Sequence, residues 1–204
     1  MLALSGWVSQ SYAETEEALC VSFEEQGRLA DALPYCKKGA EQGSSKCQYF
    51  LAMRYYLGTG VQENFAKALK LFKESARQGN RDAQLQLGHI YFYGKDVGEP
   101  DYKTAFAWYE QAAMQGDTVS TLKMAIMYEK GLGVRQNYKK AIEWYTKSAS
   151  QGTQLAQYRL GKYYYNGRVI RQDKRLAKEY FGLACDGGLF EGCDQYRILN
   201  EQGI

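Results

Sequence analysis

The sequence predicts an all-α protein built as a stack of helical pairs, and two observations carry this prediction. Apolar residues recur in steps of four along most of the chain, which is the spacing of one helix face. Glycines also recur every 36 or 37 residues, at Gln42-Gly43, Gln78-Gly79, Gln115-Gly116, Gln151-Gly152 and, in the same phase, Gly187-Gly188. A fixed period of this length indicates a repeat array. Such a stack leaves little room for a catalytic pocket, so the pattern favours binding over chemistry.

Length and composition are those of one folded domain. The chain has 204 residues, of which 45% are hydrophobic and 14% aromatic, enough for a substantial core. Its 26 basic and 23 acidic side chains give a formal charge of +3, and they are interspersed along the chain. We therefore expect no nucleic-acid partner and no membrane span.

Residues 1–13 carry no charge and predict the remnant of a signal peptide. Small residues, Ser11 and Ala13, stand at the two positions that signal peptidase reads, directly before an acidic, helix-favouring stretch. A positively charged start is missing and the apolar run is short, so a frayed N-terminus is the alternative. Export would place the protein in the periplasm or outside the cell.

The elements follow in order. Residues 14–43 are expected to form a shortened helical pair that caps the stack, with Pro34 near the start of its second helix, where proline is tolerated. Four full units follow, at 44–79, 80–116, 117–152 and 153–188. Residues 189–204 have room for one more helix, which would cover the last pair.

Three columns in steps of four mark the first helix of each unit: a small residue, then Leu or Met, then Tyr. They are Cys47, Ala83, Ser120 and Ala156; Leu51, Leu87, Met124 and Leu160; and Tyr55, Tyr91, Tyr128 and Tyr164. A further small residue follows the Leu/Met column directly and indicates close helix approach, at Ala52, Gly88, Ala125 and Gly161.

The first helix of each unit should end at a glycine suited to a left-handed cap, at Gly58, Gly94, Gly131 and Gly167. An apolar residue then lies under the loop, at Val61, Val97, Val134 and Ile170. The second helix has columns of its own, at Ala68, Ala105, Ala141 and Ala177; Phe72, Tyr109, Tyr145 and Phe181; and Ala76, Ala113, Ala149 and Cys185. We interpret these aromatic columns as core rather than as a cofactor site.

The five cysteines favour an oxidising compartment, and their odd number leaves one thiol unpaired. Cys185 and Cys193 are eight residues apart across a glycine turn, so we predict a disulfide between facing helices. Cys20 and Cys36 lie symmetrically about a probable turn near Gly27 and are the favoured second pair, with Cys36 and Cys47 as the alternative.

The repeated pattern resembles the Sel1-like repeat over roughly residues 31–188. The resemblance is clearest at Leu87-Gly88, Tyr91 and Gly94, at Gly131, Gly133 and Val134, and at Lys140-Ala141, Trp144-Tyr145 and Gln151-Gly152. Departures are Asp96 and Val169 at the second loop glycine, one extra residue around Gly98-Glu99-Pro100, and Cys36 in place of an aromatic residue.

The resemblance implies a right-handed α/α superhelix related to tetratricopeptide arrays. Proteins of this family usually act as adaptors, scaffolds or receptors for other proteins, and several bacterial members are secreted or periplasmic. The Cys185 and Cys193 spacing also resembles the cysteine-rich branch, some members of which are described as penicillin-binding or weakly β-lactam-hydrolysing.

Little in the sequence indicates catalysis. His89 is the single histidine, which limits both His-rich metal sites and His-based triads. Ser120 and Lys123 match the Ser-x-x-Lys of serine β-lactamases, but Ser120 lies in a packing column. No phosphate-binding loop and no clustered zinc-type cysteines are present. We expect no enzyme, no cofactor and no metal.

The candidate surface is the concave face, which the first helix of each unit lines in helical-pair solenoids of this kind. Its non-core positions mix aromatic and charged side chains, which suits protein recognition. They are Phe50, Met53, Tyr56, Gln86, His89, Phe92, Lys123, Ile126, Glu129, Arg159, Lys162 and Tyr165. The alternative for Tyr56, Phe92 and Tyr165 is packing against adjacent helices.

The leading hypothesis is an exported protein that binds another protein on this face without turnover. Some small periplasmic proteins of the family are immunity proteins against phospholipase-type effectors of type VI secretion, and this role fits the chain. A periplasmic adaptor for envelope assembly or signalling is an alternative, and a β-lactam-binding protein that uses Ser120 is another.

Overall fold

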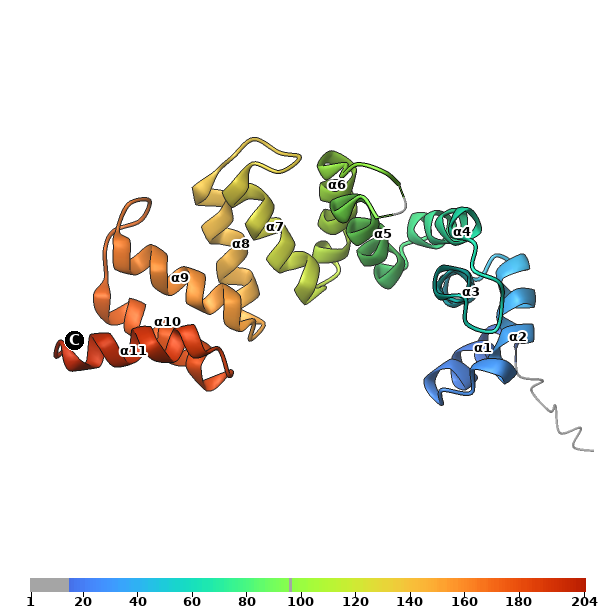
Figure 1. The fold of residues 1–204 in the computed structure, drawn as a ribbon, viewed down its shortest axis with the longest axis horizontal. Coiled ribbons are helices and arrows are strands. Elements are labelled where there is room, and N and C mark those ends of the chain that lie inside the picture. Colours follow the sequence, from blue (N-terminus) through green and yellow to red (C-terminus); the bar gives the residue numbers. More distant parts are fainter. Residues whose placement is uncertain (1–14, 96) are drawn as a thin grey trace, which may run out of the picture. The chain divides into compact units, whose positions relative to one another are not determined.

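The structure, a computed structural model, describes residues 15–95 and 97–204. These ranges form eleven α-helices and contain no strand, so the all-α fold class is confirmed (Figure 1). The helices fall into two compact units, the first ending at Gln78 and the second running from Gly79 to Ile204. The expected signal-peptide remnant, residues 1–13, and the loop residue Asp96 lie outside the described residues.

The first unit contains four helices, each packed on the next, with α1 also packed on α3. They are α1 (Glu16–Glu25), α2 (Leu29–Glu41), α3 (Ser45–Leu57) and α4 (Phe65–Arg77). A buried cluster that includes Cys20, Cys36, Cys47 and Leu51 forms the centre of the first three helices.

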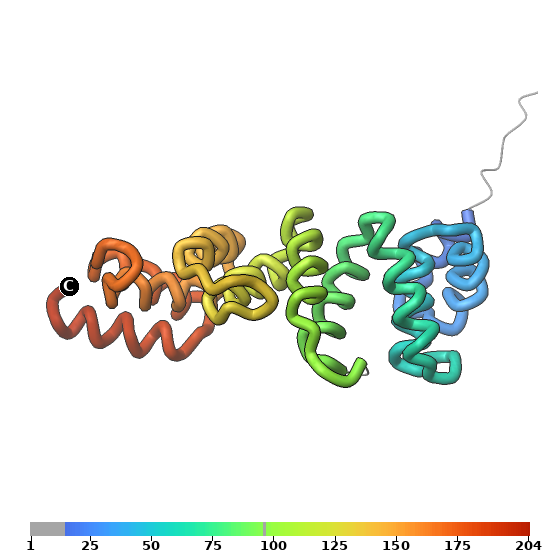
Figure 2. The backbone as a smooth tube through the Cα atoms, turned by 90° about the horizontal axis from the view of Figure 1, so that it is seen from above, coloured from blue at the N-terminus to red at the C-terminus, as the bar shows by residue number. Residues whose placement is uncertain are grey.

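The second unit contains seven helices, again packed in chain order. They are α5 (Arg81–Tyr93), α6 (Tyr102–Met114), α7 (Thr118–Lys130), α8 (Tyr138–Ser150), α9 (Gln154–Asn166), α10 (Lys174–Asp186) and α11 (Phe190–Glu201). Figure 2 follows the backbone through these pairs. The last helix, α11, packs on α10.

Most helices start at a side chain that accepts a hydrogen bond from a backbone N–H three residues on, as at Ser44, Asn80 and Asp117. First helices end as the sequence predicts. Gly58, Gly94, Gly131 and Gly167 all adopt the left-handed conformation, with φ between 66° and 72°. The caps therefore fix where each first helix stops and where its loop begins.

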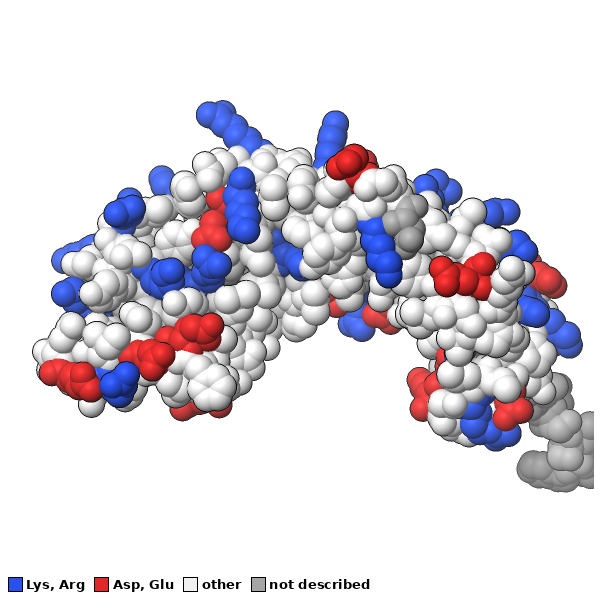
Figure 3. Space-filling model, viewed as in Figure 1, with Lys and Arg blue, Asp and Glu red and all other residues white. Residues whose placement is uncertain are grey.

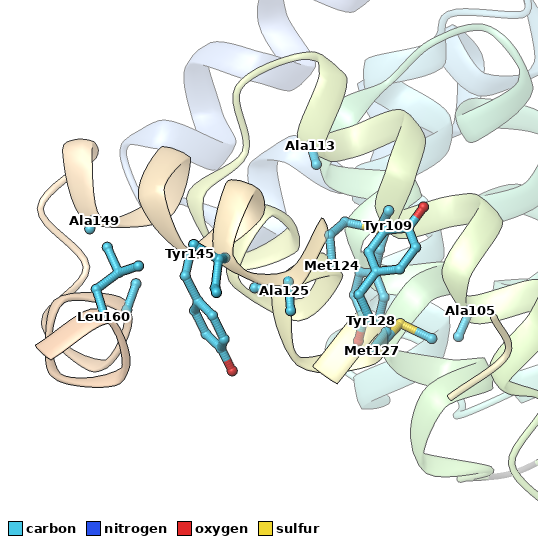
Figure 4. Close-up of a cluster of buried hydrophobic side chains, with 13 residues drawn as sticks. Ala105, Tyr109, Ala113, Met124, Ala125, Met127, Tyr128, Tyr145, Ala149 and Leu160 are labelled. Carbon is cyan, nitrogen blue, oxygen red and sulfur yellow. The ribbon is translucent and has the colours of Figure 1, made fainter. Parts of the chain in front are cut away.

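The core of the second unit follows the predicted columns (Figure 4). Tyr109 and Tyr145 are fully buried, together with the alanine columns and Met124. A Cβ added at Gly88 would lie 2.5 Å from the Tyr109 ring, and one at Gly161 would lie 2.6 Å from the Phe181 ring. Close approach within each pair therefore requires glycine at these two helical positions.

Two disulfides are present, and both are the pairs that the sequence favours. Cys20–Cys36 joins α1 to α2, and Cys185–Cys193 joins α10 to α11. Cys47 is a free, buried thiol on α3, so the alternative pairing with Cys36 is wrong. Cys47 instead packs in the small-residue column against Gly39, where an added Cβ would lie 2.3 Å from its Sγ.

Candidate functional site

In the second unit, side chains of consecutive first helices contact one another directly. Lys123 of α7 contacts Tyr93 of α5 on one side. Further along α7, Glu129 contacts Tyr163 of α9 on the other. The first-helix positions selected from the sequence therefore form two local groups in this unit, one on each side of α7.

The Glu129 cluster consists of Glu129, Tyr145, Arg159 and Tyr163. The Tyr145 hydroxyl donates to Glu129 Oε2 at 2.9 Å, and the Tyr163 hydroxyl donates to Oε1 at 2.7 Å. Arg159 Nη1 lies 3.7 Å from Glu129 Oε2, and the Glu129 side chain is only 15% exposed. A carboxylate withdrawn from water needs such partners, and Glu129 has three of them.

Both tyrosines are held in their protonated, hydrogen-donating form. Burial, followed by the charge of Glu129, raises the pKa of Tyr145 above its ordinary value. Burial, followed by the hydrogen bond to Glu129, does the same to the pKa of Tyr163. Because both phenols keep their protons, Glu129 remains an acceptor of fixed geometry, and it in turn orients Arg159.

A cleft of about 180 Å³ opens beside this cluster and is lined by Glu129, Arg159, Lys162, Tyr163 and Asn166. Its volume suits one side chain of a partner. Arg159 Nε is buried and has no hydrogen-bond partner among the described residues. The Glu129 cleft therefore presents a cationic, hydrogen-bonding lining, formed by the exposed parts of Arg159, Lys162 and Asn166.

The Lys123 cluster lies on the other side of α7. Lys123 Nζ donates to the Tyr93 hydroxyl at 2.8 Å and lies 4.6 Å from the centre of the Phe92 ring. His89 meets the Tyr109 ring edge-on, with ring centres 5.6 Å apart. Burial, followed by the charge of Lys123, lowers the pKa of His89, so its imidazole is neutral at neutral pH.

In the first unit, Phe50 and Met53 line a cleft of about 240 Å³ beside Glu24 and Arg54. These two charged side chains form a buried ion pair, in which Arg54 Nε donates to Glu24 Oε1 at 3.1 Å and Arg54 Nη2 donates to Oε2. The pair is isolated from water, with side chains 7% and 8% exposed.

The remaining selected residues contribute mainly to packing. Tyr56 lies against Phe65 and Phe72 of α4. Phe92 packs on Tyr102 and Tyr109 of α6, and the amine of Lys174 lies 5.7 Å from the Tyr165 ring centre. Ile126 packs against the core, and Gln86 is half-buried. The packing alternative therefore describes Tyr56 and Phe92, whose rings meet the second helix of their own pair.

Tyr163 and Arg54 were not among the residues selected from the sequence, although a signal exists for both. They share a column with Ile90 and Met127, which are buried apolar residues. A polar residue in this column coincides both times with a carboxylate partner, Glu129 for Tyr163 and Glu24 for Arg54. The exposed Tyr93 was missed because no column singles it out.

The structure does not assemble the Ser120–Lys123 pair. Ser120 is fully buried and its hydroxyl has no hydrogen-bond partner among the described residues. The Lys123 amine is directed to Tyr93 instead. Within the described residues no group of three or more His, Cys, Asp and Glu side chains is placed to hold a metal ion.

The repeated helical pairs with glycine caps define the chain as a Sel1 repeat protein. The Sel1 repeat family matches residues 45–80, 81–117, 119–153 and 154–189, so the chain belongs to this family. The Sel1 repeat is a protein-interaction fold. No curated protein matches the chain.

Solved structures agree with this assignment. A protective antigen of uropathogenic Escherichia coli strains, described as displaying an SLR fold, is 30% identical with a TM-score of 0.78 over 92% of this chain and 45% of that one. The present chain thus spans less than half of that protein's length. A Sel1 repeat protein from Oxalobacter formigenes is 24% identical with a TM-score of 0.75, covering 92% of this chain and 85% of that one.

A more distant match is an immunity protein from Pseudomonas aeruginosa, 21% identical with a TM-score of 0.42 over 84% of this chain and 81% of that one. At this distance it carries no argument about function. The two disulfides fit an extracytoplasmic protein. Within the described parts of the chain, no helix is both long and apolar enough to cross a membrane.

Proposed function

We propose that this Sel1 repeat protein binds another protein through the first-helix side chains of its repeats and does so without turnover. The proposed surface comprises Phe50, Met53, Tyr56, Gln86, His89, Phe92, Lys123, Ile126, Glu129, Arg159, Lys162 and Tyr165, with Tyr93 and Asn166 added from the structure. We also propose that the protein works in the periplasm or outside the cell, which the two disulfides support.

The observation that carries the proposal is the place of Glu129 in its column. The other three repeats have Tyr56, Phe92 and Tyr165 there, so an aromatic ring is sufficient for packing at this position. Withdrawing the Glu129 carboxylate, which is only 15% exposed, from water costs free energy that packing does not require. A preoriented Glu129–Arg159 pair beside an open cleft is therefore better explained by recognition than by stability.

Two biological roles fit this binding activity. One is neutralisation of a secreted phospholipase-type effector, as proposed from the family resemblance, and the other is an adaptor in envelope assembly or signalling. The identity of the captured partner distinguishes them, because a lipase-like toxin supports the first role and an envelope component the second. We do not propose β-lactam chemistry, since Ser120 has no base within hydrogen-bond reach.

The test is capture of the partner by the tagged chain from extracts of the native host, followed by calorimetry on the purified pair. The variant is Tyr93→Ala with Lys123→Ala, because Tyr93 is 60% exposed and its loss spares the core. Replacing Tyr56, Phe92 and Tyr165 together is less informative, because packing would be lost as well. The matched control is Glu110→Ala with Lys103→Ala, two exposed positions on the second helix α6.

We expect the first-helix variant to weaken binding by about tenfold or more, which is the loss of a typical hot-spot contact. The control should bind like the unmodified chain, and circular dichroism should show both variants folded. A partner that both variants retain, or the absence of any stoichiometric partner, would contradict the proposed surface.

A further inference from the structure

Charge is concentrated in one part of the chain. Residues 118–180, which include α7 to α9 and the start of α10, contain 13 Lys and Arg against 4 Asp and Glu, a formal charge of +9 compared with +3 for the whole protein. Interspersed charge, as expected for the chain as a whole, is therefore wrong for this segment. Figure 3 shows Lys and Arg side chains outnumbering acidic ones over these helices, while acidic side chains lie along α11.

The cations in this segment are largely unneutralised. Among the described residues 118–180, the ion pair formed is Arg159–Glu129. Several lysines rest on aromatic rings instead, as Lys140 does on Tyr128 and Lys147 on Trp144. This leaves a strongly positive surface available to a ligand.

Four of the cations occupy positions that oppose helix stability. Lys139 and Lys140 lie in the first turn of α8, and Lys174 and Arg175 in the first turn of α10, where neither helix has an acidic residue. A cation near a helix N-terminus is unfavourable by about 0.3–1 kcal/mol. Helix formation therefore does not account for their placement.

The Glu129 cleft lies within this basic segment and has the chemistry of a carboxylate site. Lys162 is exposed at its edge, with its amine 5.6 Å from the Tyr158 ring centre. Arg159, Lys162 and Glu129 together give a formal charge of +1, and the Arg159 side chain is 37% exposed beside the cleft. Arginine and lysine bind carboxylates through charge-assisted hydrogen bonds.

We propose that the basic segment of residues 118–180 binds an acidic segment of a partner protein, and that one Asp or Glu side chain of this partner enters the Glu129 cleft. Arg159 and Lys162 receive the carboxylate, Asn166 adds a hydrogen bond at the edge, and Glu129 holds Arg159 in place. The surrounding lysines and arginines speed association and set its salt dependence. This inference rests on the proposed protein-binding function and specifies the partner's charge.

Two observations favour an acidic protein over a nucleic acid. Binding of single strands relies on bases stacking on exposed aromatic rings. In residues 118–180, Tyr138 is the one exposed aromatic side chain, so the segment offers no row of exposed rings for successive bases. The Glu129 cleft also takes a single group rather than a run of phosphates.

The test measures fluorescence anisotropy of labelled peptides with the intact chain at low salt. The probe is an acetylated and amidated peptide of alternating Glu and Ser, compared with the same peptide containing Gln in place of Glu and with a single-stranded oligonucleotide of equal charge. Lys162→Gln removes one charge at the cleft. Lys139→Gln removes one charge from an equally exposed position outside it and is the matched control.

We expect the Glu peptide to bind more tightly than the Gln peptide, with an affinity that falls as salt rises. Lys162→Gln should weaken it by about fivefold and Lys139→Gln by no more than about twofold, since an exposed pair contributes up to about 1 kcal/mol. Equal binding of the two peptides, equal effects of the two variants, or tighter binding of the oligonucleotide would each overturn the inference.

The native partner captured by the tagged chain separates this inference from the broader function. If that partner depends on Tyr93 and Lys123 but binds Lys162→Gln unchanged, the protein-binding function stands and the carboxylate site is wrong. If it is weakened by Lys162→Gln and not by Lys139→Gln, both stand.

Discussion

At position 129 the third repeat has a carboxylate where the other repeats have an aromatic ring. This difference decides whether the buried tyrosine hydroxyl beside it has a hydrogen-bond acceptor. Tyr145 occupies the same column as Tyr109, and both rings are fully buried. Tyr145 donates to Glu129, whereas the Tyr109 hydroxyl has no hydrogen-bond partner among the described residues. The Tyr109 ring centre lies 6.0 Å from that of Phe92. The same residue type therefore has opposite energetic consequences in adjacent repeats.

This contrast gives a matched pair of variants. Tyr145→Phe removes the donor to Glu129 and should lower the free energy of unfolding by about 1.5–3 kcal/mol, the usual value for a hydrogen bond to a charged group. Tyr109→Phe removes a buried hydroxyl without a protein partner and should be neutral or stabilising. Urea denaturation of both variants measures the difference, and equal destabilisation would show that the Glu129 hydrogen bond is not the cause.

His89 predicts how stability depends on pH. Burial, followed by Lys123, lowers its folded-state pKa below the ordinary value of 6.5, while Asp117 opposes the shift. As the pH falls through 6.5, the unfolded chain binds a proton at this histidine more readily than the folded chain does, so stability falls with pH. His89→Gln should flatten this dependence between about pH 7 and pH 5.5 in thermal melts. An unchanged slope would mean that other groups, such as carboxylates, account for it.

At the scale of the element, the sequence predicts what depends on local geometry. The first helices end at Gly58, Gly94, Gly131 and Gly167 because a left-handed residue is needed there. Column spacing likewise identifies Gly88 as a close-approach position. The glycine caps and this position can both be predicted because each depends only on the phase of a residue along one helix.

Side chains that meet across repeats could not be predicted in this way. Glu129 and Arg159 are both first-helix positions predicted from the sequence, but their contact depends on how α7 and α9 lie in space. The hydrogen bonds from the Tyr145 and Tyr163 hydroxyls to Glu129 likewise depend on how α8 and α9 lie beside α7. A period gives the phase of each residue along its own helix and not the height at which neighbouring helices meet. The charge concentration in residues 118–180 is a property of the sequence, but the net charge of the whole chain does not reveal it.

The Cys185–Cys193 disulfide predicts a local change in stability. It joins α10 to α11 across a short loop, and α11 is the last helix, packed on α10. Replacing both cysteines with Ser should cost about 2–4 kcal/mol and should raise hydrogen exchange in α11 before other helices. Cys20→Ser with Cys36→Ser is the control, because it should act on α1 and α2. Unchanged exchange in α11 would mean that packing alone holds this helix.

At the scale of the whole molecule, a repeat protein draws its stability from each helical pair and its nearest neighbours. The second unit, from Gly79 to Ile204, has its own buried clusters around Tyr145 and Phe181 and its own disulfide. All residues of the Glu129 cluster and the basic segment lie within it. The first unit has a separate buried cluster and the other disulfide.

We therefore expect residues 79–204 expressed alone to be helical, to unfold cooperatively and to bind the alternating Glu-Ser peptide as the intact chain does. Residues 15–78 alone should not bind this peptide, because they contain 9 basic against 8 acidic side chains and so lack a comparable excess of charge. Circular dichroism with urea and peptide anisotropy measure folding and binding on each fragment. A folded second unit that has lost the peptide would show that the carboxylate site needs residues before Gly79. A second unit that unfolds without cooperativity would show that its own buried clusters do not suffice for folding, so that peptide binding would require the intact chain.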